Sequence, residues 1–224
     1  MTVPRWQLAV LICSGWIAAS FATQAPDEAW LSWPAERAEG IGKAAYVKGR
    51  VGGWLDTRIL TTERSYNYKL AATWLTPDVI RATARLEQLR RRLDAEAARR
   101  LVAEAESTTH TVVMVEIDPR EGAGVIPNDW LALLQFDGAS PIAGSSAPAL
   151  RQLPALAGVL RRNYDYDRYW LTFPLIDAGG KTLVPAGVAR ATLVVRIYEK
   201  EGRVTWPVPS TFRDRVAKLS AQRF

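Results

Sequence analysis

The amino-acid sequence predicts an α+β domain: a mainly antiparallel sheet or sandwich with a helical insertion after its first strand and a short C-terminal helix. Residues 65–74 alternate between polar and apolar, and a helical pattern follows them to residue 106. The last third of the chain reads as consecutive strands joined by short loops. Because strands and helices do not alternate regularly, a parallel sheet is not expected.

The first 22 residues have the plan of a secretory signal peptide: Arg5, an apolar run over residues 6–19, and small residues at positions 20 and 22. We predict cleavage after Ala22 and export of the mature chain to the periplasm or the extracellular space. An N-terminal membrane anchor is the alternative. The run is shorter than the roughly 20 apolar residues that cross a bilayer, so no permanent transmembrane span is predicted in the mature chain.

The single cysteine of the chain, Cys13, lies inside this apolar run. Lipidation there is a lesser alternative, because Ile12 stands where a lipoprotein signal has a small residue. Cleavage would leave 202 residues (224 minus 22) without a cysteine. Disulfides, thiolate metal sites and thiol catalysis are then excluded.

Two regions are predicted after the signal. Residues 23–64 read as an irregular N-terminal extension, because prolines and five glycines interrupt them. Three tryptophans in it indicate that the extension docks on its own domain. Residues 65–224 are predicted to form a single α+β domain.

The first strand and the helices after it have clear local signals. The alternation over residues 65–74 predicts a half-buried strand. Thr76, Pro77 and Asp78 supply an N-cap hydroxyl, a proline at the first helical position and an acid in the first turn. The apolar pattern that follows fits one long helix or two joined near Asp94, which could cap the second; two are favoured.

The middle of the chain is less uniform. Residues 109–118 are rich in β-branched side chains and predict a central strand. Residues 130–135 fit a strand and a helix equally well. Residues 149–162 predict a helix with Pro154 at or near its first turn.

The C-terminal part predicts a hairpin followed by a helix. Its two strands have apolar faces formed by Leu193, Val195 and Ile197 and by Val204, Trp206 and Val208. The loop is predicted at residues 199–202, with Gly202 available for a positive φ. Pro207 cannot donate to a ladder, so the last strand should lie at a sheet edge. Ser210 is expected to cap a helix over residues 211–221.

The net charge of +6 is unevenly distributed. Residues 85–106 mix six arginines with five carboxylates, which is typical of a solvated helix face. The excess lies in the last fourteen residues, where Arg213, Arg215, Lys218 and Arg223 face Asp214 alone. Together with export, this favours an envelope protein or anionic polymer as partner over nucleic acid.

Signatures of catalysis and of cofactor binding are missing. The single histidine, His110, stands at a strand entry, and neither Gly-x-Ser-x-Gly nor Ser-x-x-Lys occurs. Arg37 and Ala44 occupy two obligatory positions of the phosphate loop suggested by Gly42-Lys43. A zinc site is not expected, because one histidine and no mature cysteine leave too few nitrogen and sulfur ligands. No cofactor and no metal site are therefore predicted.

The stretch NYDYDRYWLTFPLID, residues 163–177, carries the candidate ligand-binding residues Tyr164, Asp165, Tyr166 and Asp167; Trp30 completes the set as a candidate exposed aromatic. The inward face of the strand is predicted to hold Tyr169, Leu171, Phe173 and Leu175. Two unpaired carboxylates cannot continue a dry face, so the buried strand should begin after Asp167. Tyr164 to Asp167 then form a lead-in loop.

These observations predict an exported, non-catalytic domain that binds a protein or envelope polymer through an aromatic and basic surface. One alternative is an exported carbohydrate-active hydrolase using paired acids among Glu116, Asp118, Asp165 and Asp167. Another is a calcium-stabilised β module, since acids two apart on an extended segment share one side. No residue pattern in the chain matches the signature of a characterised family.

Overall fold

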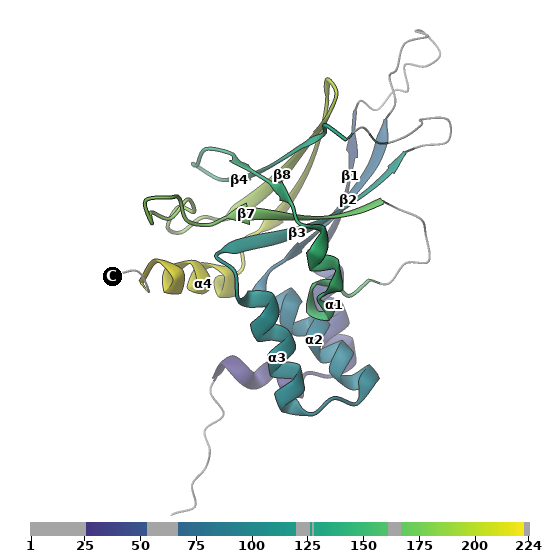
Figure 1. Cartoon of the computed structure of the whole chain (residues 1–224), viewed down its shortest axis with the longest axis vertical. Helices are drawn as coiled ribbons and strands as arrows, with labels where there is room; N and C mark the ends of the chain where they lie inside the picture. The colour runs from purple at the N-terminus through teal and green to yellow at the C-terminus, as the bar shows by residue number, and fades with distance from the viewer. Residues whose placement is uncertain (1–25, 53–66, 120–125, 127, 161–166, 222–224) are drawn as a thin grey trace, which may run out of the picture.

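The computed structural model describes residues 26–52, 67–119, 126, 128–160 and 167–221. Within these ranges the chain forms two antiparallel sheets and four α-helices (Figure 1). The predicted α+β class with a mainly antiparallel sheet and a C-terminal helix is confirmed. The first sheet has the order β1 (Tyr46–Val51), β2 (Tyr68–Leu75), β3 (His110–Pro119), β7 (Asp167–Pro174) and β6 (Ser145–Ser146). The second has the order β5 (Ile142–Ala143), β4 (Leu131–Phe136), β8 (Arg190–Ile197) and β9 (Lys200–Pro207).

The two sheets meet at both of their sides, so together they form a nearly closed sheet. On one side the chain passes from β5 to β6 through Gly144, where a Cβ atom would lie 2.7 Å from the ring of Phe173. On the other side β1 crosses β9, and a Cβ atom on Gly202 would lie 2.4 Å from the carbonyl oxygen of Arg50. Gly202 thus serves close backbone approach and not the turn, contrary to prediction. The residue of the hairpin turn with positive φ is Tyr198, at 54°.

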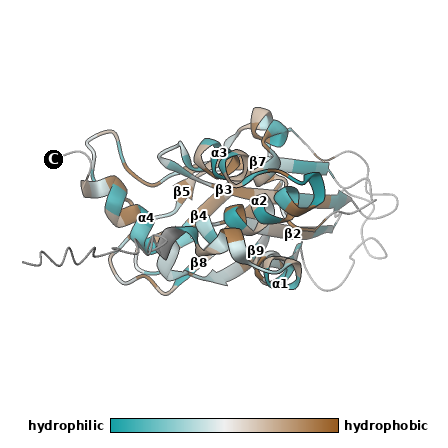
Figure 2. Cartoon of the chain, turned by 90° about the horizontal axis from the view of Figure 1, so that it is seen from below, coloured by the Kyte–Doolittle hydropathy of each residue, from teal (hydrophilic) through white to brown (hydrophobic). Residues whose placement is uncertain are grey.

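Helices cover the outer face of the first sheet. They are η1 (Pro26–Ser32), α1 (Ala35–Ala45), α2 (Pro77–Arg91) and α3 (Ala95–Glu106). The fourth α-helix, α4 (Ser210–Ala221), closes one end of the space between the sheets. There Phe212 packs edge to face on Trp74, with ring centroids 4.6 Å apart. Figure 2 shows hydrophilic and hydrophobic residues on each of these α-helices, as expected for helices with one buried side.

The core has two parts. One lies between the two sheets and the other between the first sheet and the helices. Strand β2 contributes to both, so Ala71 and Thr73 are buried on the face that the alternation predicted to be polar, and Leu75 continues that buried face. In β2 only Lys69 is exposed. Alternation in the sequence could not show that helices cover the second face.

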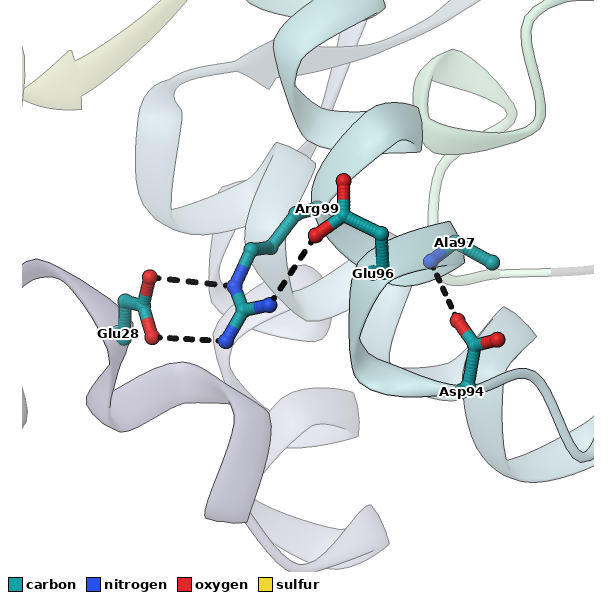
Figure 3. A network of polar contacts seen from close by, with 5 residues as sticks. All are labelled: Glu28, Asp94, Glu96, Ala97 and Arg99. Carbon is teal, nitrogen blue, oxygen red and sulfur yellow. Dashed lines mark hydrogen bonds and ion pairs between the residues drawn. The ribbon is translucent and has the colours of Figure 1, made fainter.

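Two local predictions about helices are confirmed. The region after Thr76 forms two helices, and the carboxylate of Asp94 accepts a hydrogen bond from the Ala97 amide at 2.6 Å (Figure 3). Thr76 occupies the N-cap position of α2, although its hydroxyl makes no capping hydrogen bond. Within the described residues, no helix is long and apolar enough to cross a membrane.

Two other predictions are wrong. Residues 35–51 of the predicted irregular extension form α1 and β1, because packing against α2 and pairing with β2 outweigh their low intrinsic propensities. Residues 148–156 form two short 3₁₀ helices, η3 (Pro148–Gln152) and η4 (Pro154–Leu156), instead of a continuous helix. Pro154 cannot donate within a helix and separates the two.

The remaining strands agree with the sequence. The undecided segment forms β4, and β3 lies centrally between β2 and β7. The two predicted apolar faces of the hairpin are buried. Strand β9, which contains Pro207, ends the order of its sheet as predicted.

Candidate functional site

A cleft of about 260 Å³ opens where α1, the start of α2 and the ends of β2 and β9 meet. Its lining is mainly aliphatic and aromatic. The residues are Ile41, Ala44, Ala45, Trp74, Thr76, Asp78, Val79, Trp206, Pro207 and Pro209. The lining comes from three stretches of chain, residues 41–45, 74–79 and 206–209. They are distant in sequence and meet only in the fold.

Two tryptophans form the base of the cleft. Trp74 and Trp206 are 1% and 2% exposed, and their ring centroids lie 6.0 Å apart. The indole of Trp74 donates to the hydroxyl of Thr111 at 2.8 Å, and that of Trp206 donates to the carbonyl of Ala45 at 2.7 Å. Both donors are therefore occupied, and the rings are held in place without a ligand.

Asp78 carries the only charge among the described residues that line the cleft. Its Oδ2 accepts a hydrogen bond from the hydroxyl of Thr211 at 2.7 Å, which links α2 to α4. The position in the first turn of α2 also favours a carboxylate, because the N-terminus of a helix has a partial positive charge. The cleft is thus an apolar recess with one carboxylate at its wall.

Of the predicted ligand-binding residues, Tyr164, Asp165 and Tyr166 lie outside the described residues. Asp167 is exposed at the first position of β7, and Leu171, Phe173 and Leu175 farther along are buried. The buried part of the strand thus begins after Asp167, as predicted.

Tyr169 lies next to Asp167 on the inward side of β7. Its ring packs edge to face on Trp130, with centroids 5.0 Å apart. Burial, and to a lesser extent the charge of Asp167, raises the pKa of Tyr169 above its usual value. This aromatic pair is partly exposed. It joins β7 of the first sheet to the residue before β4 of the second sheet, and neither ring lines the cleft.

The prediction that Trp30 is exposed is wrong. Trp30 is 4% exposed and packs into the core beneath the helices with residues of α2 and α3. The segment before it has no periodicity, so the sequence could not show that η1 turns this ring inward. Trp74, Trp170 and Trp206 are buried, as expected for packing residues.

Two of the four acids of the hydrolase alternative, Glu116 and Asp118, are held in ion pairs. Glu116 is 2% exposed and pairs with Arg168 at 2.8 Å across β3 and β7. Asp118 pairs with Lys69 at 3.2 Å. Among the residues that the structure describes, no three His, Cys, Asp or Glu side chains gather closely enough to hold a metal ion.

Part of the predicted basic segment also has an internal role. Arg215 on α4 donates to the carbonyl oxygens of Thr108 and His110 at 2.8 and 3.1 Å. Burial lowers the pKa of Arg215, and the charge of Glu106 partly opposes this effect. Arg215 therefore fastens α4 to the start of β3 and is not an open contact for an anionic partner.

A second polar contact anchors the N-terminal segment. Arg99 on α3 donates to both carboxylate oxygens of Glu28, at 3.1 and 3.0 Å, and to Glu96 at 3.3 Å (Figure 3). This arrangement holds η1 against α3. Within the mixed charges of residues 85–106, Arg99 is therefore paired with carboxylates.

Comparison with known proteins identifies no family for the chain. No family model and no curated protein matches the chain. A solved structure, described as a novel protein of unknown function from Burkholderia pseudomallei, is 14% identical and covers 83% of this chain and 87% of its own, with a TM-score of 0.42. At that identity and TM-score, the similarity says nothing about activity.

Proposed function

We propose that the chain is an exported, non-catalytic domain that binds a protein or an envelope polymer, with the cleft between α1, α2 and β9 as a contact site. The observation that supports this proposal is the character of the cleft. It is an apolar recess over two immobilised tryptophans, and its lining contains no histidine, cysteine, serine or lysine. Its polar side chains are Thr76 and Asp78, so the lining can bind an apolar group but contains no histidine or lysine base to activate a nucleophile.

The size of the cleft favours a macromolecular partner. Sites for whole small molecules usually enclose about 300–1,000 Å³, whereas this cleft has a volume of about 260 Å³. It can take one side chain or one sugar substituent. Burial of each methylene group contributes about 0.8 kcal/mol, so an anchor of four carbons contributes about 3 kcal/mol, and further contacts around the cleft must supply the rest.

Export is the second part of the proposal and has independent support in the N-terminal sequence. Residues 1–22 have the three parts of a secretory signal. Fractionation of cells that express the full chain, with N-terminal sequencing of the product, tests this part. A product that retains Met1 in the cytoplasm would contradict it.

The binding experiment uses residues 23–224 as bait for an envelope fraction. Ala44 is exposed on α1 and lines the cleft, so Ala44→Trp should fill the recess without disturbing the core. Ala143 is exposed on β5, at the end of the second sheet opposite to β9, so Ala143→Trp is the matched control.

We expect the wild type and Ala143→Trp to retain the same protein or polymer and Ala44→Trp to lose it. Failure to retain any reproducible ligand, including purified glycans, would refute binding. Equal retention by all three proteins would refute the role of the cleft.

A further inference from the structure

We infer that the cleft recognises an alkylammonium group, specifically a lysine side chain of the partner, with its methylene chain along the apolar wall and its ammonium on Asp78. This inference rests on the proposed function and specifies the chemistry of the ligand. It is argued from the charge, the shape and the hydrogen bonds of the cleft.

The first argument is charge complementarity. A carboxylate can accept about four hydrogen bonds, and among the described residues Asp78 accepts one, from Thr211, and pairs with no cation. The full negative charge of Asp78 exceeds the roughly half positive charge at the start of α2. The wall of the cleft is therefore net negative where a cation would lie.

The second argument is the apolar surface that leads to this carboxylate. Ile41, Ala44 and Pro207 line the cleft from two sides over the tryptophan base. An aliphatic stem can pack there while its charged end stays near the more polar rim, which is how lysine side chains are usually accommodated. Neither indole N–H competes for the carboxylate, because both donate within the protein.

The third argument distinguishes lysine from arginine. A guanidinium binds a carboxylate best through two parallel hydrogen bonds, which require both carboxylate oxygens. Oδ2 of Asp78 already accepts from Thr211, so Thr211 competes at one of the two oxygens that the guanidinium fork needs. An ammonium is a compact charge that needs no such fork, and its second donor can reach toward the hydroxyl of Thr76, which makes no capping hydrogen bond.

The experiment measures binding at the cleft directly. Residues 23–224, labelled with ¹⁵N, are titrated with n-butylammonium, with n-butanol and with butyrate, and the indole N–H signals of Trp74 and Trp206 are followed by NMR. We expect butylammonium to bind about tenfold or more tightly than butanol, as for one hydrogen bond to a charged group. Butyrate should bind most weakly.

Asp78→Asn should abolish the preference for butylammonium and leave butanol binding unchanged. The asparagine oxygen can still accept from Thr211, so the link to α4 is preserved. Asp137→Asn is the matched control, because Asp137 is an exposed acid in the turn after β4 that pairs with Arg190. A lysine-containing peptide and its acetyl-lysine counterpart should then differ in the same direction as butylammonium and butanol.

The outcomes separate the two proposals. Equal binding of butylammonium and butanol, or an ammonium preference that survives Asp78→Asn, would overturn the amine inference and leave the cleft as a binding site. If neither compound shifts the two indole signals, or if Ala44→Trp binds both compounds as well as the wild type does, the cleft itself is not the contact site and the proposed function loses its support.

Discussion

Removal of Arg168 should strongly destabilise the protein, because it leaves the carboxylate of Glu116 buried without a counter-charge. Glu116 is 2% exposed and sits at the centre of the first sheet, opposite Arg168 on β7. Breaking a buried ion pair from one side costs about 3–5 kcal/mol. The side chain of Arg168 is 25% exposed, so the pair is not fully buried. We therefore expect Arg168→Met to lower the free energy of unfolding by about 3 kcal/mol, at the lower end of that range.

The same sheet provides a matched control, in an ion pair between β2 and β3. Lys69 and Asp118 form an ion pair on the same face, but their side chains are 58% and 29% exposed. Exposed pairs contribute about 0–1 kcal/mol, so Lys69→Met should cost less than about 1 kcal/mol. Any larger effect of Arg168→Met then reflects burial and not position in the sheet.

The assay is equilibrium unfolding in urea of residues 23–224, with the free energy of unfolding compared at equal m-values. The double variant Glu116→Met with Arg168→Met should be more stable than the sum of the two single changes predicts, because it leaves no buried charge. Additive single effects, or a cost of Arg168→Met similar to that of Lys69→Met, would refute the reasoning.

Three further predictions concern packing and titration. Trp30→Ala should lower the free energy of unfolding by about 3–5 kcal/mol, as for a large side chain removed from a core, since Trp30 is buried; a loss below about 0.5 kcal/mol, typical of surface sites, would show that the ring is exposed in solution. Gly202→Ala should destabilise by about 1–3 kcal/mol through overpacking, because its Cβ would lie 2.4 Å from a backbone oxygen. Gly40→Ala, on α1 with open space around it, should stabilise by about 0.5–1 kcal/mol, and thermal unfolding of both variants checks the opposite signs. Ultraviolet titration of the tyrosines should show that Asp167→Asn lowers the raised pKa of Tyr169 only in part, because burial is the larger cause; a complete return to the usual value would assign the shift to the charge instead.

Features that depend on a few neighbouring residues could be predicted from the sequence. Asp94 caps a helix through the amide three residues later, and this geometry needs only the local chain. The same holds for the alternating face of β7 and for the central position of β3, whose side chains are β-branched. The α+β class followed from the order of these local signals.

Features that depend on distant contacts could not be predicted. Glycines at positions 40 and 42 indicated an irregular segment, yet α1 forms because it packs against α2. Trp30 and Glu116 are buried only because other elements cover them. In each case the free energy of tertiary packing exceeds the local preference of the residues.

The sequence by itself determined the fold class, most strands and helix boundaries, and the scarcity of catalytic motifs. Only the tertiary structure decided where a ligand can bind. The cleft is assembled from residues 41–45, 74–79 and 206–209, and Asp78, which serves locally as a first-turn acid of α2, becomes the charged wall of that cleft. A binding site made from separate segments has no spacing in the sequence, because its geometry exists only after those segments have packed together.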